Sequence, residues 1–321
     1  MKCRLVLIMF LILGVLVGSG CGKSLPKEDI RQVEDDTGRE VSVPAHPSRI
    51  VSLTYGTDEI LLDLVDENRV IGISKYSGNT DISFLPADKA DHIPHRVGND
   101  VEQIMALKPD LVISSTAMPA DVTNVLRSSG IPVYVSVIAA NWDEMEVKVR
   151  GVAKAVHEEA AGESMVQEME SKKAKLEEKL SSIGPGEERC ALGLSFRGIL
   201  GKKGTLFSEV LVMAHVKDGA ARYDVPKGTN AYLSMEILPE IDPDVILLPV
   251  WKVKAGDDEK AFAREIMENP AYRDVKAVKN GRLIPFPEKY KYVMSQHITD
   301  AMEASARAVY PELFQESESS D

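Results

Sequence analysis

The chain has 321 residues, 44% hydrophobic and 27% charged, which is enough for one large or two medium globular domains with real cores. Acidic residues outnumber basic ones by 50 to 38, and the formal net charge is −12. This excess of negative charge disfavours a nucleic-acid-binding surface, because contacts to phosphates need clustered Lys and Arg.

The N-terminus has the pattern of a signal peptide. Lys2 and Arg4 form a positive n-region, and the apolar run Leu5–Val17 is too short to span a bilayer comfortably. The following G-S-G-C, which ends at Cys21, resembles the lipobox of bacterial lipoproteins, with Gly18 where an aliphatic residue is usual. The resemblance implies cleavage before Cys21, lipidation of that residue and anchoring to a membrane. Ordinary secretory cleavage is the alternative.

The positions of the cysteines agree with a secreted protein that is lipidated at Cys21. Cys3 leaves with the signal peptide and Cys21 is modified, so Cys190 is alone in the mature chain. We therefore expect no intramolecular disulfide and no Cys-based zinc or iron–sulfur site.

The next part of the chain predicts strands alternating with helices. The expected elements are a hairpin over Val33–Val43, strands over Arg49–Leu53, Arg69–Ser74, Asp110–Ser115 and Ile131–Val137, and a helix over Thr57–Leu64. This alternation implies a mostly parallel sheet covered by helices.

Residues 142–183 are helical in pattern. Trp142–His157 is amphipathic, and Glu159–Leu180 carries Met and Leu on one stripe surrounded by Lys and Glu. The second helix would span about 33 Å, and Gly and Pro at 184–186 end it. We interpret it as a rigid link between two α/β halves; a surface helix on a single domain is the alternative.

The second half restarts the alternation. The expected elements are strands over Cys190–Phe196, Val245–Pro249 and Arg282–Phe286, and helices over Ser208–Val216, Ser234–Glu240, Glu259–Met267 and Gln296–Val309.

One pattern occurs in both halves at a constant offset. D-V-E-Q-I-M-A-L-K-P-D-L-V-I (100–113) and S-M-E-I-L-P-E-I-D-P-D-V-I-L (234–247) share a Glu and a Pro-Asp pair in register. Each copy predicts a short helix with Glu in its first turn, a Pro-Asp break and an apolar strand. The long offset indicates two similar lobes and not a short-period solenoid. A common helix-to-strand connector is the alternative.

Together with this repeat, several further motifs resemble one family. They are R-I-V-S-L-x-x-x-x-D-E-I-L (49–61), N-R-V-I-G-I-S (68–74), G-I-P-V-Y (130–134) and N-P-A-Y-R-D-V-K-A-V-K-N-G-R-L-I-P-F (269–286). In order and spacing they resemble the helical-backbone (class III) periplasmic binding proteins, the ABC-importer substrate-binding lipoproteins that capture ferric siderophores, haem or cobalamin. The resemblance covers about residues 36–312.

The resemblance implies an α/β fold of two Rossmann-like lobes joined by one long α-helix, with the ligand cleft between the lobes and little movement on binding. The implied segments are a signal peptide (1–20), a lipidated tether (21–35), an N-terminal lobe (36–140), a connecting helical segment (141–184), a C-terminal lobe (185–312) and an acidic tail (313–321).

In this family one surface Glu on each lobe docks into Arg residues of the permease. The matching positions are Glu102 and Glu236. Two carboxylates on a rigid body can orient it on a two-fold partner and steer the encounter. The alternative is that each Glu only favours the dipole of its helix.

Ligand contacts are expected from the loops that follow the strands, where open α/β sheets place their sites. Aromatic rings supply flat contact area, and Arg or Lys neutralises an anionic chelate. The candidates are Tyr55, Tyr76, Thr116, Met118, Trp142, Phe196, Arg197, Trp251, Lys252, Tyr290 and Tyr292.

The resemblance implies a binding protein without catalysis or a covalent cofactor, whose ligand is an iron or cobalt chelate. We rank ferric siderophore first, then cobalamin and haem, because basic residues near the expected cleft suit an anionic chelate. These are Arg197, Lys252, Lys289 and Lys291. The implied partners are an ABC permease dimer with its ATPase subunits. The protein is expected to be monomeric and lipid-anchored outside the cytoplasm, in a periplasm or on the outer face of the membrane.

Other interpretations are kept open. His92 and His95 are expected in a solvated loop, and the cleft loops carry few His, which disfavours capture of a bare metal ion. His95 or Met118 as a haem axial ligand is an alternative. A chelatase-like enzyme is disfavoured because G-x-S-x-G, H-E-x-x-H and G-x-x-x-x-G-K are absent from the sequence. A structural lipoprotein would have no ligand-filled cleft.

Overall fold

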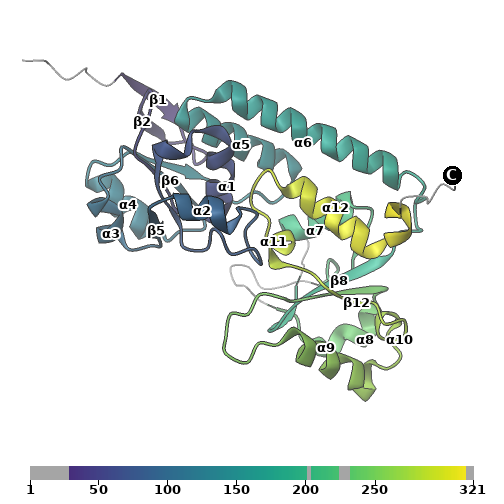
Figure 1. The fold of residues 1–321 in the computed structure, drawn as a ribbon. Coiled ribbons are helices and arrows are strands. Elements are labelled where there is room, and N and C mark those ends of the chain that lie inside the picture. Colours follow the sequence, from purple (N-terminus) through teal and green to yellow (C-terminus); the bar gives the residue numbers. More distant parts are fainter. Residues whose placement is uncertain (1–28, 201–203, 224–231, 316–321) are drawn as a thin grey trace, which may run out of the picture.

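The computed structural model describes residues 29–200, 204–223 and 232–315. Two α/β lobes lie at an angle to one another, and one long helix runs along both (Figure 1). This confirms the predicted architecture of two Rossmann-like lobes joined by a helix.

The N-terminal lobe is built on a five-stranded parallel sheet in the order β5-β4-β3-β6-β7. Its strands are β3 (Ile50–Ser52), β4 (Val70–Ser74), β5 (His95–Val97), β6 (Leu111–Ser115) and β7 (Val133–Ser136). Its helices are α1 (Tyr55–Leu64), η1 (Glu67–Arg69), α2 (Ala87–His92), α3 (Val101–Ala106) and α4 (Ala120–Ser128). A separate antiparallel hairpin, β1 (Ile30–Glu34) and β2 (Glu40–Pro44), precedes the sheet.

The C-terminal lobe has a sheet in the order β10-β8-β11-β12, with β9 antiparallel to β8. Its strands are β8 (Cys190–Ser195), β9 (Gly198–Ile199), β10 (Lys217–Asp218), β11 (Val245–Leu248) and β12 (Leu283–Pro285). Its helices are α7 (Leu206–Met213), η2 (Met235–Ile237), α8 (Leu238–Ile241), α9 (Glu259–Glu268), η3 (Pro270–Tyr272), α10 (Lys276–Lys279), α11 (Glu288–Lys291), α12 (Ile298–Val309) and η4 (Pro311–Phe314).

The link between the lobes is α6 (Glu159–Leu180), which has the predicted bounds. It packs along α5 (Trp142–Val156), and α5 in turn packs on α1 and β7. We expected α5 to belong to the connecting segment, but these contacts make it part of the N-terminal lobe. Among the described residues, α6 is therefore the element through which the chain passes from one lobe to the other.

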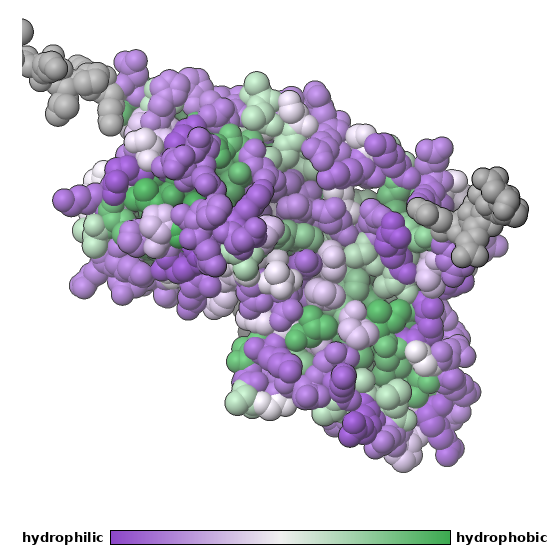
Figure 2. All heavy atoms as spheres, viewed as in Figure 1, coloured by the Kyte–Doolittle hydropathy of each residue, from purple (hydrophilic) through white to green (hydrophobic). Residues whose placement is uncertain are grey.

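One apolar cluster runs through both lobes. It contains Ile60 of α1, Met145 of α5, Met169 of α6, Leu211 of α7 and Met302 of α12, all buried. Because close-packed apolar interiors resist deformation, a shared core of this kind restrains the angle between the lobes. Figure 2 shows that hydrophilic residues cover most of the outer surface on the face viewed, with apolar residues in small separate areas.

The repeated sequence forms the same local structure in both lobes. Lys108 and Asp242 occupy equivalent positions before the Pro, and both are left-handed, with φ of 50° and 48°. Asp110 accepts hydrogen bonds from the backbone N–H of Ser48 and Arg49 at 2.7 and 2.9 Å. Asp244 accepts one from Cys190 N–H at 2.8 Å. In each lobe, the Asp of the repeat thus holds the beginning of the neighbouring parallel strand.

Three boundaries differ from the expected ones. Strand β1 begins at Ile30, so residues 30–35 belong to the hairpin and not to a tether, because five residue pairs join β1 to β2. Phe314 packs under Lys179 and Arg307, so the folded chain extends past 312. Finally, His92 ends α2 and His95 begins β5, where we expected one loop.

The expected signal peptide, the lipidation site at Cys21 and residues 316–321 of the acidic tail lie outside the described residues. Among the helices of the described chain, none is long and apolar enough to cross a bilayer.

Candidate ligand-binding cleft

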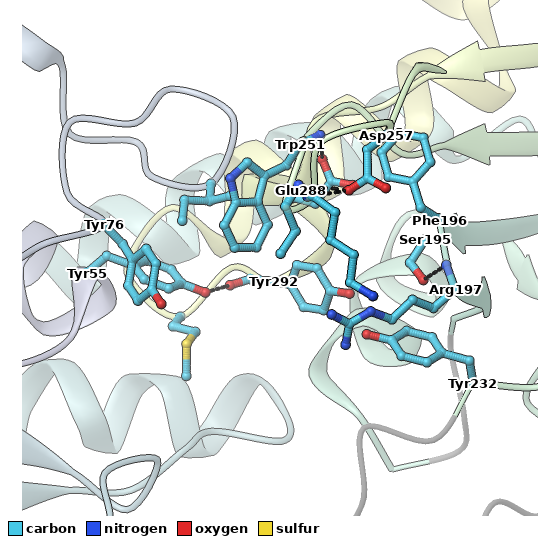
Figure 3. Close-up of a pocket in the computed structure, with 14 residues that line it drawn as sticks. Tyr55, Tyr76, Ser195, Phe196, Arg197, Tyr232, Trp251, Asp257, Glu288 and Tyr292 are labelled. Atoms are coloured by element: carbon cyan, nitrogen blue, oxygen red, sulfur yellow. Dashed lines mark hydrogen bonds between the residues drawn. The ribbon is translucent and has the colours of Figure 1, made fainter. Parts of the chain in front are cut away.

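A cavity of about 560 Å³ lies between the lobes, within the range of small-molecule sites. Figure 3 shows Tyr55 and Tyr76 on one side of it and Ser195, Phe196, Arg197 and Tyr232 on the other. The remaining lining residues are Ile82, Trp251, Val253, Lys254, Asp257, Glu288, Tyr292 and Met294.

The N-terminal wall is formed by two tyrosines and an isoleucine. Tyr55 is the first residue of α1, and Tyr76 lies in the turn after β4. The Tyr76 ring meets Trp251 of the other lobe edge to face, with centroids 6.2 Å apart. Ile82 completes this wall, and beside it the Lys75 ammonium lies 5.2 Å from the centroid of the Tyr76 ring.

The C-terminal wall begins with the tight turn between β8 and β9. Ser195 pairs with Gly198, so Phe196 and Arg197 form the tip of the turn and point toward the cavity. Gly198 has a φ of 137°, and a Cβ there would lie 2.6 Å from the carbonyl oxygen of Leu233. A glycine is needed at this position for both reasons, and it fixes the place of Arg197.

Two carboxylates line the cavity but are occupied by backbone donors. Asp257 accepts hydrogen bonds from the N–H groups of Val253 and Lys254 at 2.9 and 2.8 Å. Glu288 accepts one from Trp251 N–H at 2.7 Å. These carboxylates hold the loop that follows β11 in place.

We call residues 286–297 the C-terminal strap. Within it, Lys291 forms a buried ion pair with Glu288 at 3.0 Å. The Lys291 ammonium also donates to the carbonyl oxygens of Leu194 and Leu248, at the ends of β8 and β11. Burial lowers the pKa of Lys291 to about 8. The strap is thereby fastened to the C-terminal sheet.

The same strap is also bonded to the N-terminal lobe. Tyr55 Oη donates to the carbonyl oxygen of Tyr292 at 2.8 Å. Ser295 Oγ donates to the buried carboxylate of Glu59 at 2.5 Å. Gln296 Nε2 donates to Asp63 at 2.8 Å. These contacts join the lobes at the base of the cavity, in addition to the link through α6.

The environment of the cavity changes the titration of its tyrosines. Burial raises the pKa of Tyr292, with a further contribution from the neighbouring Tyr232. Burial also raises the pKa of Tyr55, with a further contribution from Glu59. These phenols therefore stay neutral at physiological pH and act as hydrogen-bonding and stacking surfaces.

The structure brings together part of the set expected from the sequence. The residues that line the cavity are Tyr55, Tyr76, Phe196, Arg197, Trp251 and Tyr292. The residues that lie outside its lining are Thr116, Met118, Trp142, Lys252 and Tyr290, so the expectation for these five is corrected.

The five have other environments. Trp142 is buried at the start of α5, donates to Glu146 and lies under Lys173. Met118 packs on an apolar cluster of the N-terminal lobe, and Tyr290 packs on Phe84 and Phe286. Thr116 Oγ1 accepts from the N–H of Ile138, and Lys252 is exposed one residue beyond Trp251.

The basic residues on which our ligand ranking rested also divide into one that lines the cavity and others that do not. Arg197 lines the cavity, but Lys252 does not. Lys289 lies over the rings of Phe84 and Tyr290, and Lys291 is buried in its ion pair. The positive charge available to a ligand is therefore smaller than the sequence indicated.

Several lining residues were missed by the sequence interpretation. Tyr232, Lys254, Asp257 and Met294 come from irregular segments without periodicity. Glu288 could have been found, because it shares the short helix α11 with Lys291 at i, i+3 and lies four positions before the expected cleft residue Tyr292.

The histidines do not gather at the cavity. His46 and His157 stack on each other, His92 pairs with Glu67, and His297 pairs with Asp300. Among the residues that the structure describes, no group of three or more His, Cys, Asp or Glu side chains is placed to hold a metal ion.

The two glutamates of the repeat are exposed on different lobes. Glu102 lies in the first turn of α3, which Asp100 caps, and Glu236 lies in η2, which Ser234 caps. Figure 1 shows α3 on one lobe and α8, which follows η2, on the other. Within the described ranges, neither carboxylate has a hydrogen-bond or ion-pair partner, so both are available to another molecule.

Comparison with known proteins gives consistent results. A family model described as periplasmic binding protein matches residues 50–290. A curated relative, the uncharacterized ABC transporter substrate-binding lipoprotein YvrC of Bacillus subtilis, is 24% identical over 98% of this chain and 100% of its own length.

Solved structures share the fold. The molybdate periplasmic binding protein MolA of Haemophilus influenzae, with molybdate bound, has a TM-score of 0.70 at 19% identity, covering 90% of this chain and 94% of its own. The periplasmic heme-binding protein RhuT from Roseiflexus sp. RS-1 has a TM-score of 0.66 at 23% identity, covering 82% and 99%.

Proposed function

Because the chain belongs to the periplasmic binding protein family, we propose that it is the substrate-binding lipoprotein of an ABC importer, which captures a metal chelate outside the cytoplasm and delivers it to a permease. The observation that carries the proposal is the cavity between two lobes that are tied both by α6 and by the strap. A preformed site of this size loses little free energy to ordering on binding.

The first candidate ligand is a ferric siderophore, with cobalamin and haem as alternatives. The aromatic lining offers flat contact area to a large chelate, and Arg197 offers a charge-assisted hydrogen bond to an anionic group. The lining carries no arrangement of acid and base that would suggest turnover, since both of its carboxylates are held by backbone N–H groups. A chelatase-like reaction is therefore not proposed.

Delivery is proposed to use Glu102 and Glu236. Both carboxylates are exposed, and one stands on each lobe, so a rigid body presents them at a fixed separation. An ABC permease dimer with its ATPase subunits would supply the cationic partners. Lipidation at Cys21 would keep the protein, as a monomer, at the outer face of the membrane that holds the permease.

The ligand is tested by purifying the mature protein from its host and recording its visible spectrum. Ferric siderophores, corrinoids and haem absorb differently, and titration of the emptied protein with each chelate gives the stoichiometry. We expect saturable one-to-one binding without conversion of the chelate. Product formation would contradict the proposal, and so would failure of all three classes to bind.

Delivery is tested by replacing Glu102 and Glu236 together with Ala. Uptake by cells should be lost while the affinity of the purified protein for the chelate is unchanged, because the two sites are separate. Glu170→Ala, at an exposed position on α6, is the matched control and should leave uptake normal. Loss of chelate binding in the double variant would contradict the assignment.

A further inference from the structure

The C-terminal strap has a second face that does not line the ligand cavity. Tyr292 and Met294 line that cavity, whereas Gln296 and His297 line a separate groove of about 500 Å³. We call it the α6 groove, because its other lining residues include Asp63 of α1 and Met165, Glu168, Met169 and Lys172 of α6. Figure 1 shows α6 running beside α12, the helix that follows the strap. A molecule in the α6 groove would therefore touch α1, α6 and the strap together.

One buried atom at this groove lacks a hydrogen-bond partner. Gln296 is only 8% exposed, and its Nε2 donates to Asp63 at 2.8 Å and to the carbonyl oxygen of Glu59 at 3.1 Å. Its Oε1 is buried and receives no hydrogen bond from the part of the chain that the structure describes. Because buried acceptors are rarely left without a donor, this atom points to a bound molecule that donates to it.

The other polar groups of the groove also act mainly as acceptors. The Asp300 carboxylate can only accept, so His297 Nδ1, 2.5 Å away, carries the proton, and the neutral ring presents Nε2 as an acceptor. Lys172 is the donor of the lining, but it already pairs with Glu168 at 2.8 Å. The groove is therefore suited to a molecule that brings N–H groups of its own.

The charges at the groove favour a cation. Asp63 and Glu168 face one ammonium group of the lining, Lys172, whose pKa is raised by the bond to Glu168 and further by Asp300 and Asp63. Just outside the lining, Asp300 adds a carboxylate and Lys289 adds an ammonium group. Carboxylates thus outnumber ammonium groups while His297 is neutral, which disfavours an anion as the occupant.

The apolar part of the groove comes from two methionines. Met169 is buried, and Met165 packs on the same apolar cluster that joins the lobes. Their flexible, polarizable thioether chains suit contact with an alkyl chain. The volume of the groove lies within the range of small-molecule sites.

We infer that the α6 groove is a second binding site, separate from the ligand cavity, and that it takes an aliphatic primary ammonium. The ammonium group meets the carboxylate of Asp63 and supplies the donor that Gln296 Oε1 lacks, directly or through one ordered water. The alkyl chain lies on Met165 and Met169. Because the occupant contacts both α1 and the strap, it also restrains the two lobes relative to each other.

The experiment is an NMR titration of the mature protein with three probes of equal chain length. n-Butylammonium has both the charge and the N–H donors. Butyltrimethylammonium keeps the charge without N–H donors, and butan-1-ol keeps a donor without the charge. Binding is followed through the side-chain amide signals of Gln296, which are assigned by their loss in Gln296→Leu.

n-Butylammonium should shift the Gln296 signals saturably, with a dissociation constant of about 1 mM for so small a ligand. The other two probes should bind about tenfold more weakly or less, because each lacks either the charge or the N–H donors. Asp63→Asn keeps an acceptor for Gln296 Nε2 and should weaken n-butylammonium about tenfold, with butan-1-ol unaffected. Glu170→Gln is the matched control, since it removes one carboxylate of α6 outside the groove lining.

The restraint on the lobes is measured with one spin label on each lobe. Saturating n-butylammonium should narrow the distribution of distances between the labels, and butan-1-ol at the same concentration should not. Binding without any narrowing would contradict the restraint.

The site itself is overturned if n-butylammonium leaves the Gln296 signals unmoved, which would mean that water alone meets Oε1. It is also overturned if the three probes bind equally, or if Asp63→Asn and Glu170→Gln have the same effect. The proposed function is decided separately by the chelate titration and the uptake experiment, because the α6 groove and the ligand cavity share no lining residue.

Discussion

The two lobes share a framework and differ in what they present to the cavity. In both, the Asp of the repeat holds the start of a parallel strand after a left-handed residue. In the N-terminal lobe, Ser52, Ser74 and Ser136 at the strand ends are buried. In the C-terminal lobe, β8 turns at once into β9 and leaves Arg197 exposed at the tip. The difference teaches that a side chain at a strand end can reach the cavity only where no other element covers it.

The strap is held to the C-terminal lobe by its buried ion pair and to the N-terminal lobe by hydrogen bonds. Substitutions in the strap can therefore test how each lobe contributes to stability. The following substitutions alter one lobe, or the contact between the two, and are given from the largest expected effect to the smallest.

The largest loss of stability is expected from Lys291→Ala. The change removes the ammonium that satisfies Leu194, Leu248 and the carboxylate of Glu288, and it leaves that carboxylate buried with backbone donors alone. Breaking a buried pair in this way costs about 3–5 kcal/mol of unfolding free energy. Urea denaturation of the purified variant measures it. Lys289→Ala, two residues away, is the control, because its ammonium lies over the partly buried rings of Phe84 and Tyr290 and has no buried ion pair. Equal losses in both would show that Lys291 does not fasten the strap.

The next largest change in stability is expected from a substitution of Asp58, a fully buried residue of the N-terminal lobe. Burial raises the pKa of its carboxyl to about 7, although Ser77 and the N–H of Ser74 donate to it. A raised pKa means that the folded state binds the proton more tightly than the unfolded state. Its contribution to stability is therefore present below about pH 4 and is lost as the pH rises to about 7.

The measurement is the free energy of unfolding between pH 4 and pH 7 for the wild type and for Asp58→Asn, which imitates the protonated carboxyl. The decline over this window should be smaller in the variant, which should be the more stable protein at pH 7. An identical pH profile for the two proteins would rule out Asp58 as the group responsible.

The smallest loss of stability is expected from removing one of the two serine hydroxyls that donate to the carboxylate of Glu59. Ser83 and Ser295 donate to the same carboxylate, Ser83 from within the N-terminal lobe and Ser295 from the strap. Each substitution by Ala should cost about 1.5 kcal/mol, the low end for a bond to a charged group, since Glu59 retains other donors. Ser295→Ala alone should widen the distribution of distances between spin labels on the two lobes. Equal widening in both variants would mean that the bond from Ser295 does not restrain the lobes.

The sequence predicted the lobes and their helices well because these features depend on local pattern. The apolar stripe of Glu159–Leu180 gave the bounds of α6, and the repeat gave equivalent turns at Lys108 and Asp242. It also placed Arg197 and Trp251 in the cavity, because they directly follow strands of a parallel sheet. What failed was the distinction between an aromatic residue in a cleft and one in a core, as Trp142 illustrates.

By itself, the amino-acid sequence determined the architecture, since hydrophobic periodicity and turn residues act over a few positions. Only the tertiary structure decided which charges remain free for a ligand. Lys291 and Arg197 are both basic residues close to cavity-lining positions, but one is buried in an ion pair and the other has no partner among the described residues. The reason is physical: the availability of a charge depends on burial and on neighbours distant in sequence, which no local pattern encodes.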